Sequence, residues 1–428
     1  MSFLAYVILI MFAIVIFGVI NEKILQLPVP IGMMVLALGV SVFTICMGNI
    51  GLVDTGHSIF THVNNFNFDE FLTDGILCFM LFTGSSHVKI NNLAKNAKAI
   101  SLLSVLSTVV AVVIYGGLFY LINILFFLNF SFIECCLLGC ILVPTDPIAA
   151  TGLLNKLGIS EDIMTIIEGE SLFNDGIGVT CFIIVSNIIM ESSNKNGFQI
   201  MIESVFGAAL VALFISFLFF KLMEKVDSPI YHICISLLNV SLTYLVCEHL
   251  GFSGVIASVV CGLYFSTMLE KTQLLQKCSR GYYEDFWHIL DALMNYTLYI
   301  LIGFSFLHVK IIDVRILMLA LIINIVSRAI GVALSTKLMG KTPDEMGVLK
   351  FSTLLTYGGL KGGLSLALMI SSVAFLPKDT YDVFLSITYC TIVFTTIVQG
   401  LTVTNVYNLL MKLDINRFME KFKLKTTE

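Results

Sequence analysis

The segment EGESLFNDGIGV, residues 168–179, concentrates oxygen-bearing side chains within an otherwise apolar stretch. If it is helical, Ser171 and Asp175 lie one turn apart and form one oxygen-rich ridge, while Glu170 and Asn174 form the adjacent ridge. Glu168 adds a third carboxylate. Hard oxygen ligands suit Na⁺ and Li⁺ without excluding K⁺, and a carboxylate can also take a proton. The segment is therefore a candidate site for a small cation or a proton.

A second segment, ILVPTDPIAATGLL, interrupts another apolar stretch at residues 141–154. Pro144 and Pro147 flank Thr145 and Asp146, and neither proline can donate to the carbonyl oxygen four residues earlier. In a membrane those carbonyls need partners, and a bound cation with its waters would serve as one. The half-helix that begins near Pro147 points its positive end inward, where Asp146 can offset it. Asp146 is thus a helix cap, part of an ion site, or both.

A third segment, TYGGLKGGLSLAL, carries a lone lysine among glycines at residues 356–368. Gly358, Gly359, Gly362 and Gly363 surround Lys361, and glycine pairs are a common cause of helix breaks. We therefore expect a second broken helix, with Lys361 near the negative end of one half-helix.

The cations available to these carboxylates are few. Arg328 is the only arginine that we place within a membrane span, and it is the natural partner for Glu170 or Glu168. For Glu170 a structural ion pair is the favoured interpretation. Too few cations remain in the spans to pair Asp175, which is therefore the favoured functional carboxylate.

The composition indicates a membrane protein. The chain has 428 residues, of which 57% are hydrophobic and 12% charged, with a mean hydropathy of +0.96. A soluble protein carries about twice that charged fraction. The net charge of −5 and the lack of a basic stripe argue against nucleic-acid binding. The 11 cysteines show no CxxC spacing, so we interpret them as small apolar residues and not as disulfides or metal ligands.

We predict an all-α polytopic protein with thirteen spans, each close to or above the roughly 20 residues that a membrane helix needs. The spans lie at 3–21, 28–47, 68–87, 98–127, 132–154, 162–189, 198–221, 228–248, 252–270, 285–306, 314–337, 347–371 and 381–411. With this count, 18 of the 24 basic residues fall on one side of the membrane and four on the other. The positive-inside rule then puts the N-terminus outside and the C-terminus in the cytoplasm.

An odd number of spans permits two six-span halves of opposite topology joined by span 7. This inverted-repeat plan is common in secondary transporters, in which corresponding broken helices mark the binding site. Spans 5 and 12, which hold the two predicted breaks, occupy corresponding places in the two halves.

At these residues the chain resembles the sodium/proton exchanger superfamily, specifically its bacterial and archaeal NhaP-like branch. The matching segments include VPTDPIAATGLL, EGESLFNDGIGV, SRAIGV and YGGLKGGLSLAL. The resemblance implies a homodimer with crossing broken helices 5 and 12. It implies a dimerisation domain at 1–87 and 228–306, a moving core at 98–189 and 314–411, a linker helix at 198–221 and a short cytoplasmic tail at 412–428.

The resemblance also implies residue roles. Asp175 would carry the ion and the proton, with Ser171, the Thr145 backbone and Asp146 around the cation, and Asn174 would brace the crossing of spans 5 and 6. Two positions depart from the family pattern: Lys361 stands where arginine is usual, and Thr83 stands where some archaeal members have a glutamate ligand.

The resulting prediction is an antiporter, not an enzyme, that exchanges Na⁺ or Li⁺ for H⁺ across a bacterial or archaeal cell membrane. The ions are transported substrates, and no cofactor is expected. Because relatives with aspartate at the Asn174 position are generally electrogenic, Asn174 implies electroneutral one-for-one exchange. The alternatives are K⁺/H⁺ antiport, a cation channel, for which no filter-like loop is present, and an intramembrane aspartyl protease using Asp146 and Asp175, which lack the GxGD setting.

Overall fold

The computed structural model describes residues 3–49, 75–146, 151–152, 154–155, 158–190, 197–272, 277–310, 312–343 and 346–411. Within these ranges the fold is all-helical, as predicted, and the only β-type pairing is one isolated bridge. Pro147 and the predicted tail at 412–428 lie outside the described residues.

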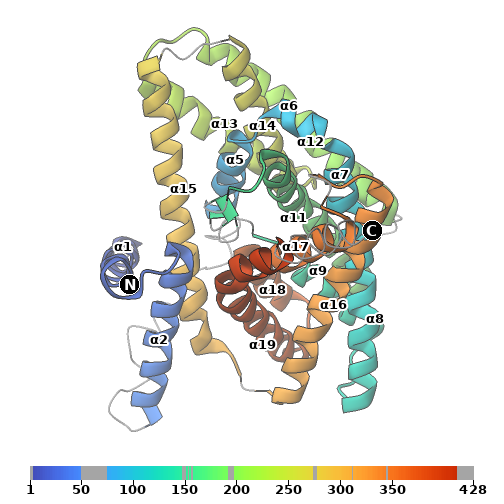
Figure 1. Ribbon diagram of the computed structural model, residues 1–428. Coiled ribbons are helices and arrows are strands. Elements are labelled where there is room, and N and C mark those ends of the chain that lie inside the picture. Colours follow the sequence, from blue (N-terminus) through green and yellow to red (C-terminus); the bar gives the residue numbers. More distant parts are fainter. Residues whose placement is uncertain are drawn as a thin grey trace, which may run out of the picture.

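The helices are shown in Figure 1. Their bounds are α1 Phe3–Ile20, α2 Val29–Asn49, α5 Cys78–Ser86, α6 Ile90–Lys95, α7 Ala97–Ser101, α8 Ser107–Phe126, α9 Phe132–Leu142, α11 Glu161–Ile189, α12 Gly197–Met223, α13 Pro229–His249, α14 Gly254–Thr272, α15 Lys277–Ser305, α16 Val314–Met339, α17 Val348–Gly358, α18 Gly363–Ser371 and α19 Lys378–Phe394. A π-helical segment, Leu102–Leu106, joins α7 to α8, and another, Thr395–Gln399, follows α19.

Nine helices in the described part of the chain are long and apolar enough to cross a membrane. Of three shorter apolar helices, Gly75–Ser86 and Phe132–Leu142 lie within predicted spans 3 and 5, and Gly363–Ala374 overlaps predicted span 12 and ends three residues beyond it. Predicted span 10, at 285–306, overlaps the C-terminal part of α15, a helix that is 29 residues long but more polar. The chain is therefore a polytopic integral membrane protein, while the exact number of spans and the inverted repeat stay predictions.

Local sequence signals explain several helix starts. Ser131 and Glu134 form a capping box at α9, because the Ser131 hydroxyl accepts from the Glu134 N–H and the Glu134 carboxylate accepts from the Ser131 N–H. The Ser160 hydroxyl caps α11, and the Asp313 carboxylate caps α16. The helix that holds the carboxylates of segment 168–179 thus begins at a defined residue.

Close helix–helix contacts depend on small residues, as is usual in membranes. A Cβ at Gly303 of α15 would lie 2.5 Å from the Ala37 side chain of α2, and one at Gly331 of α16 would lie 2.6 Å from the Ser107 carbonyl oxygen of α8. In Figure 1, α15 runs alongside α2, and α16 runs alongside α8. These pairs form the frame around the short helices α9, α17 and α18.

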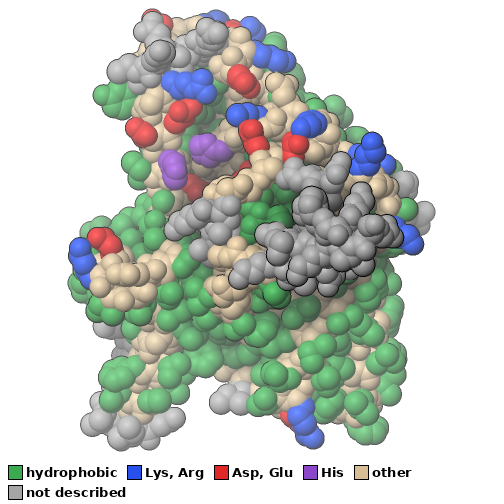
Figure 2. Space-filling view, in the orientation of Figure 1, with side chains coloured by type: hydrophobic (Ala, Val, Ile, Leu, Met, Phe, Trp, Pro, Cys, Tyr) green, Lys and Arg blue, Asp and Glu red, His purple; other side chains and the backbone are tan. Residues whose placement is uncertain are grey.

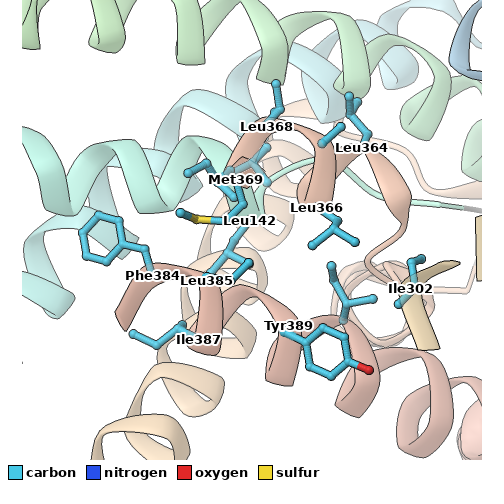
Figure 3. Packing of buried hydrophobic residues seen from close by; sticks show 14 of the residues in the cluster. Leu142, Ile302, Leu364, Leu366, Leu368, Met369, Phe384, Leu385, Ile387 and Tyr389 are labelled. Atoms are coloured by element: carbon cyan, nitrogen blue, oxygen red, sulfur yellow. The ribbon is translucent and has the colours of Figure 1, made fainter. Parts of the chain in front are cut away.

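An apolar core packs around the short half-helices α9 and α18. In Figure 3, side chains of α18 pack against α19, the end of α9 and α15. The labelled members are Leu142, Ile302, Leu364, Leu366, Leu368, Met369, Phe384, Leu385, Ile387 and Tyr389. On the face shown in Figure 2, charged and histidine side chains gather at one end and apolar side chains cover most of the opposite half. That distribution suits a chain embedded in lipid.

Candidate cation-binding site

The two predicted helix breaks meet in space. α9 ends at Leu142 and α17 ends at Gly358, and the residues that follow each end, 143–146 and 359–362, are not helical. The Asp146 N–H donates to the Leu360 carbonyl oxygen at 2.8 Å, which forms the isolated bridge. A Cβ at Gly362 would lie 2.7 Å from the Asp146 Cβ, so only glycine leaves room for Asp146 there. We call residues 143–146 and 359–362 the crossing.

Asn174 braces this crossing with both ends of its amide. Its Nδ2 donates to the Val143 carbonyl oxygen and to the Thr145 Oγ1, each at 3.1 Å. Its Oδ1 accepts from the Thr108 hydroxyl of α8 at 2.5 Å. Asn174 is 1% exposed, so these contacts replace the water that a surface amide would bind. These contacts join the helix of predicted span 6 to the non-helical segment of predicted span 5, and the role of Asn174 in bracing those two spans stays a prediction.

Lys361 lies on the non-helical segment between α17 and α18, and its side chain binds the end of the other broken helix, α9. Its ammonium donates to the Val143 carbonyl oxygen at 3.1 Å, at the C-terminal end of α9, and the side chain is 2% exposed. A positive charge at a helix C-terminus is stabilising. The carbonyl that Pro147 would leave free therefore has two protein donors, Asn174 and Lys361. The hydroxyl groups of Thr395 and Thr396 bind the Lys361 backbone.

Arg328 pairs with Glu170 and not with Glu168. Its Nη1 and Nη2 donate to the Glu170 Oε1 and Oε2 at 3.3 and 3.2 Å, and Nη2 also donates to the Leu355 carbonyl oxygen at 3.2 Å. The predicted ion pair is therefore present and buried. A Cβ at Gly359 would lie 2.0 Å from the Arg328 Nε, so this glycine admits the guanidinium between α16 and the crossing.

Asp175 lies against residues 143–146 of the crossing. Its Oδ1 accepts from the Thr145 N–H at 3.2 Å. The Ser171 hydroxyl donates to the Thr145 carbonyl oxygen, and the Thr145 hydroxyl lies 3.4 Å from the Ser171 Oγ. The structure thus brings together the oxygen atoms of Asp175, Ser171 and Thr145, which the sequence placed on two separate segments.

A cavity of about 450 Å³ reaches these oxygen atoms. That volume has room for roughly 15 water molecules. Its described lining contains four carboxylate side chains and no Lys or Arg, a composition that favours a cation over an anion. The polar side chains that line it are Thr145, Asp146, Thr151, Asn155, Glu168, Ser171, Asp175, His87, His288 and Asp291.

The sequence of residues 8–409 matches the profile of the family described as sodium/hydrogen exchanger, transmembrane. The chain belongs to this exchanger family. It is 28% identical over 407 residues to the Na(+)/H(+) antiporter NhaP of Pseudomonas aeruginosa, and this match covers 90% of this chain and 91% of that protein. It is 31% identical over 270 residues to the Na(+)/H(+) antiporter NhaH of Halobacillus dabanensis, covering 60% of this chain and 64% of that protein.

The fold is similar to that of the sodium proton antiporter MjNhaP1 from Methanocaldococcus jannaschii. The TM-score is 0.75, the sequence identity is 20%, and the match covers 96% of this chain and 99% of that chain. At this identity the likeness concerns the fold alone.

Several side chains of this candidate site were not singled out from the sequence. Tyr299 of α15 donates its hydroxyl to the Asp146 Oδ2 at 2.7 Å, and Asp291 of the same helix lines the cavity. The sequence did offer one signal for these two residues: Asp291 and Tyr299 are eight residues apart on one predicted helix, a spacing that puts them near the same face. Thr83, in contrast, is not among the residues that line the cavity, and its hydroxyl donates to the Phe79 carbonyl oxygen of its own helix.

Proposed function

We propose that the chain exchanges Na⁺ for H⁺ across the membrane, with Asp175 as the shared site of the two ions. One observation carries this proposal: Asp175 lies at a cavity whose described lining holds three further carboxylates and no Lys or Arg. The hydroxyl groups of Ser171 and Thr145 and the Thr145 carbonyl supply additional oxygen ligands beside it. The family membership and the Na(+)/H(+) antiporters among its relatives support the same activity.

The exchange follows from competition for one carboxylate. A proton and a partly dehydrated Na⁺ both require the oxygen atoms of Asp175, so binding of one displaces the other. If the core moves only when Asp175 is loaded, one cation leaves for each proton that enters. Asn174 uses its carbonyl oxygen and its NH₂ group to brace the crossing. It carries no proton through the cycle, and the exchange is electroneutral.

The arrangement in the membrane is part of the proposal. Residues 1–87 and 228–306 form a dimerisation domain of a homodimer, and 98–189 and 314–411 form the moving core. The packing of α15 on α2 and of α14 on α5 supports the first grouping, because it joins the two sequence ranges. The bias of basic residues supports an external N-terminus and a cytoplasmic C-terminus in a bacterial or archaeal cell membrane.

Reconstitution of the purified protein into vesicles tests the activity. A pH gradient is imposed, and Na⁺, Li⁺ or K⁺ is added separately while the internal pH is recorded. Dissipation of the gradient by Na⁺ or Li⁺ supports the proposal, whereas dissipation by K⁺ alone would replace it with K⁺/H⁺ antiport. Cation conductance that ignores the pH gradient would instead indicate a channel, and cleavage of a helical substrate an intramembrane protease.

A further inference from the structure

The side chain of Asp146 is held from a helix outside the crossing. Tyr299 of α15 is 0% exposed, and its hydroxyl donates to the Asp146 Oδ2 at 2.7 Å. This distance is normal for a hydrogen bond from a hydroxyl group to a carboxyl oxygen. The preceding residue, Leu298, packs on Gly363, where a Cβ would lie 2.1 Å from the Leu298 Cδ1. At these two residues α15 directly contacts the segment that forms the cation-binding site.

Asp146 is consequently restrained at several points. Its N–H is bound to the Leu360 carbonyl oxygen, its Cβ lies close to Gly362, and one carboxylate oxygen accepts from Tyr299. The carboxylate therefore has a defined direction at the cavity wall, even though its side chain is only half-buried. Removal of the Tyr299 hydroxyl would release a restraint that acts directly on the carboxylate.

The kind of donor matters for a cation site. Asp175, Glu168 and Asp291 share the cavity with Asp146, and their negative charges repel its carboxylate. An arginine or a lysine in place of Tyr299 would also hold Asp146, but its positive charge would oppose a cation in the cavity. A phenol orients the carboxylate and leaves the negative potential of the cavity intact.

We propose that Tyr299 is a positioning residue of the exchange site, which holds Asp146 in the direction that favours cation binding. The inference rests on the proposed cation exchange and adds the residue that sets the apparent cation affinity. Tyr299 acts through Asp146 and does not contact the transported ion.

The test compares Tyr299→Phe with wild type in vesicles over a range of Na⁺ concentrations. The half-saturating Na⁺ concentration should rise roughly tenfold, because a hydrogen bond to a charged group is lost. The maximal rate should stay within about twofold, since a loss of ground-state binding leaves the later steps unchanged. Tyr389→Phe is the matched control, because Tyr389 is equally buried and its hydroxyl lies 3.5 Å from the Gly303 carbonyl oxygen, away from the cavity. The control should leave both quantities unchanged.

A second readout separates binding from transport and from folding. The melting temperature of the detergent-solubilised protein is measured against Na⁺ concentration, with choline chloride at matched ionic strength. A bound ligand raises the melting temperature. The Na⁺ concentration that produces a given rise in melting temperature should increase in Tyr299→Phe by the same factor as in the flux assay.

Three results would distinguish a failure of the positioning role of Tyr299 from a failure of the proposed exchange function. An unchanged Na⁺ dependence of Tyr299→Phe in both assays, or a loss of maximal rate alone, overturns the positioning role while leaving the exchange function standing. In the third result, the wild-type protein shows no Na⁺-dependent proton flux, but Na⁺ raises its melting temperature and Tyr299→Phe weakens that effect. This result overturns the exchange function and supports the positioning role.

Discussion

The buried ion pair between Arg328 and Glu170 gives a quantitative test of the packing around the crossing. The side chains are 10% and 4% exposed and share two hydrogen bonds. Glu170→Gln leaves a buried guanidinium without its counter-ion and should cost roughly 3–5 kcal/mol of unfolding free energy. Arg328→Met strands the Glu170 carboxylate and also removes the donor to the Leu355 carbonyl, which should add about 1 kcal/mol to its cost.

The double variant distinguishes a direct pair from two independent effects. Because neither charge is left alone, its loss should be smaller than the sum of the single losses by roughly 2–3 kcal/mol. Unfolding free energies are measured in detergent by denaturant titration, with the apparent melting temperature as a second measure. Strictly additive losses would refute the pairing.

An exposed pair of the same residue types provides the control. Arg280 and Glu284 form an i,i+4 ion pair on α15, with side chains 56% and 52% exposed. Neutralising either residue should cost less than about 1 kcal/mol, because water screens the charge that remains. A cost equal to that of Glu170→Gln would mean that burial does not determine the effect.

Three further predictions concern the crossing. Gly359→Ala should destabilise the protein markedly, because the new Cβ would lie 2.0 Å from the Arg328 Nε, whereas Gly84→Ala, which meets nothing within 4 Å, should change the melting temperature little. Lys361→Met leaves a buried carbonyl at the end of α9 with one donor fewer, so we expect a loss of roughly 1–3 kcal/mol in the same unfolding assay. Because Asn174 carries no proton, Na⁺-driven proton flux should not change when the membrane potential of vesicles is clamped at several values, and a flux that follows the potential would show that a second group titrates.

Much of the fold and part of the site could be predicted from the sequence, because the relevant signals are local. Long apolar stretches predict membrane helices, and the proline pair and the glycine cluster predict the two breaks. The pairing of Arg328 with a nearby glutamate followed from the scarcity of buried cations. The sequence could not show that Arg328 pairs with Glu170 and not with Glu168, because this depends on which face of α11 contacts α16.

The remaining contacts depend on residues far apart in the chain. The Val143 carbonyl accepts from Lys361, 218 residues away, and Asp146 accepts from Tyr299, 153 residues away. Neither residue type reveals such a partner through spacing or periodicity. Thr83 illustrates the same limit: its place in the family pattern suggested a gap among the cation ligands, but its side chain does not line the cavity.

The central claim, that Asp175 is the shared site of Na⁺ and H⁺, is tested most directly by Asp175→Asn. The amide oxygen can still accept from the Thr145 N–H, so the variant should fold, insert and keep its melting temperature in the absence of Na⁺. Asp285→Asn, at an exposed aspartate on α15, is the matched control and should retain wild-type flux. Na⁺-driven proton flux is measured in vesicles for all three proteins. Flux at the level of empty vesicles in Asp175→Asn is the predicted result, and substantial Na⁺-dependent flux in that variant would contradict the account.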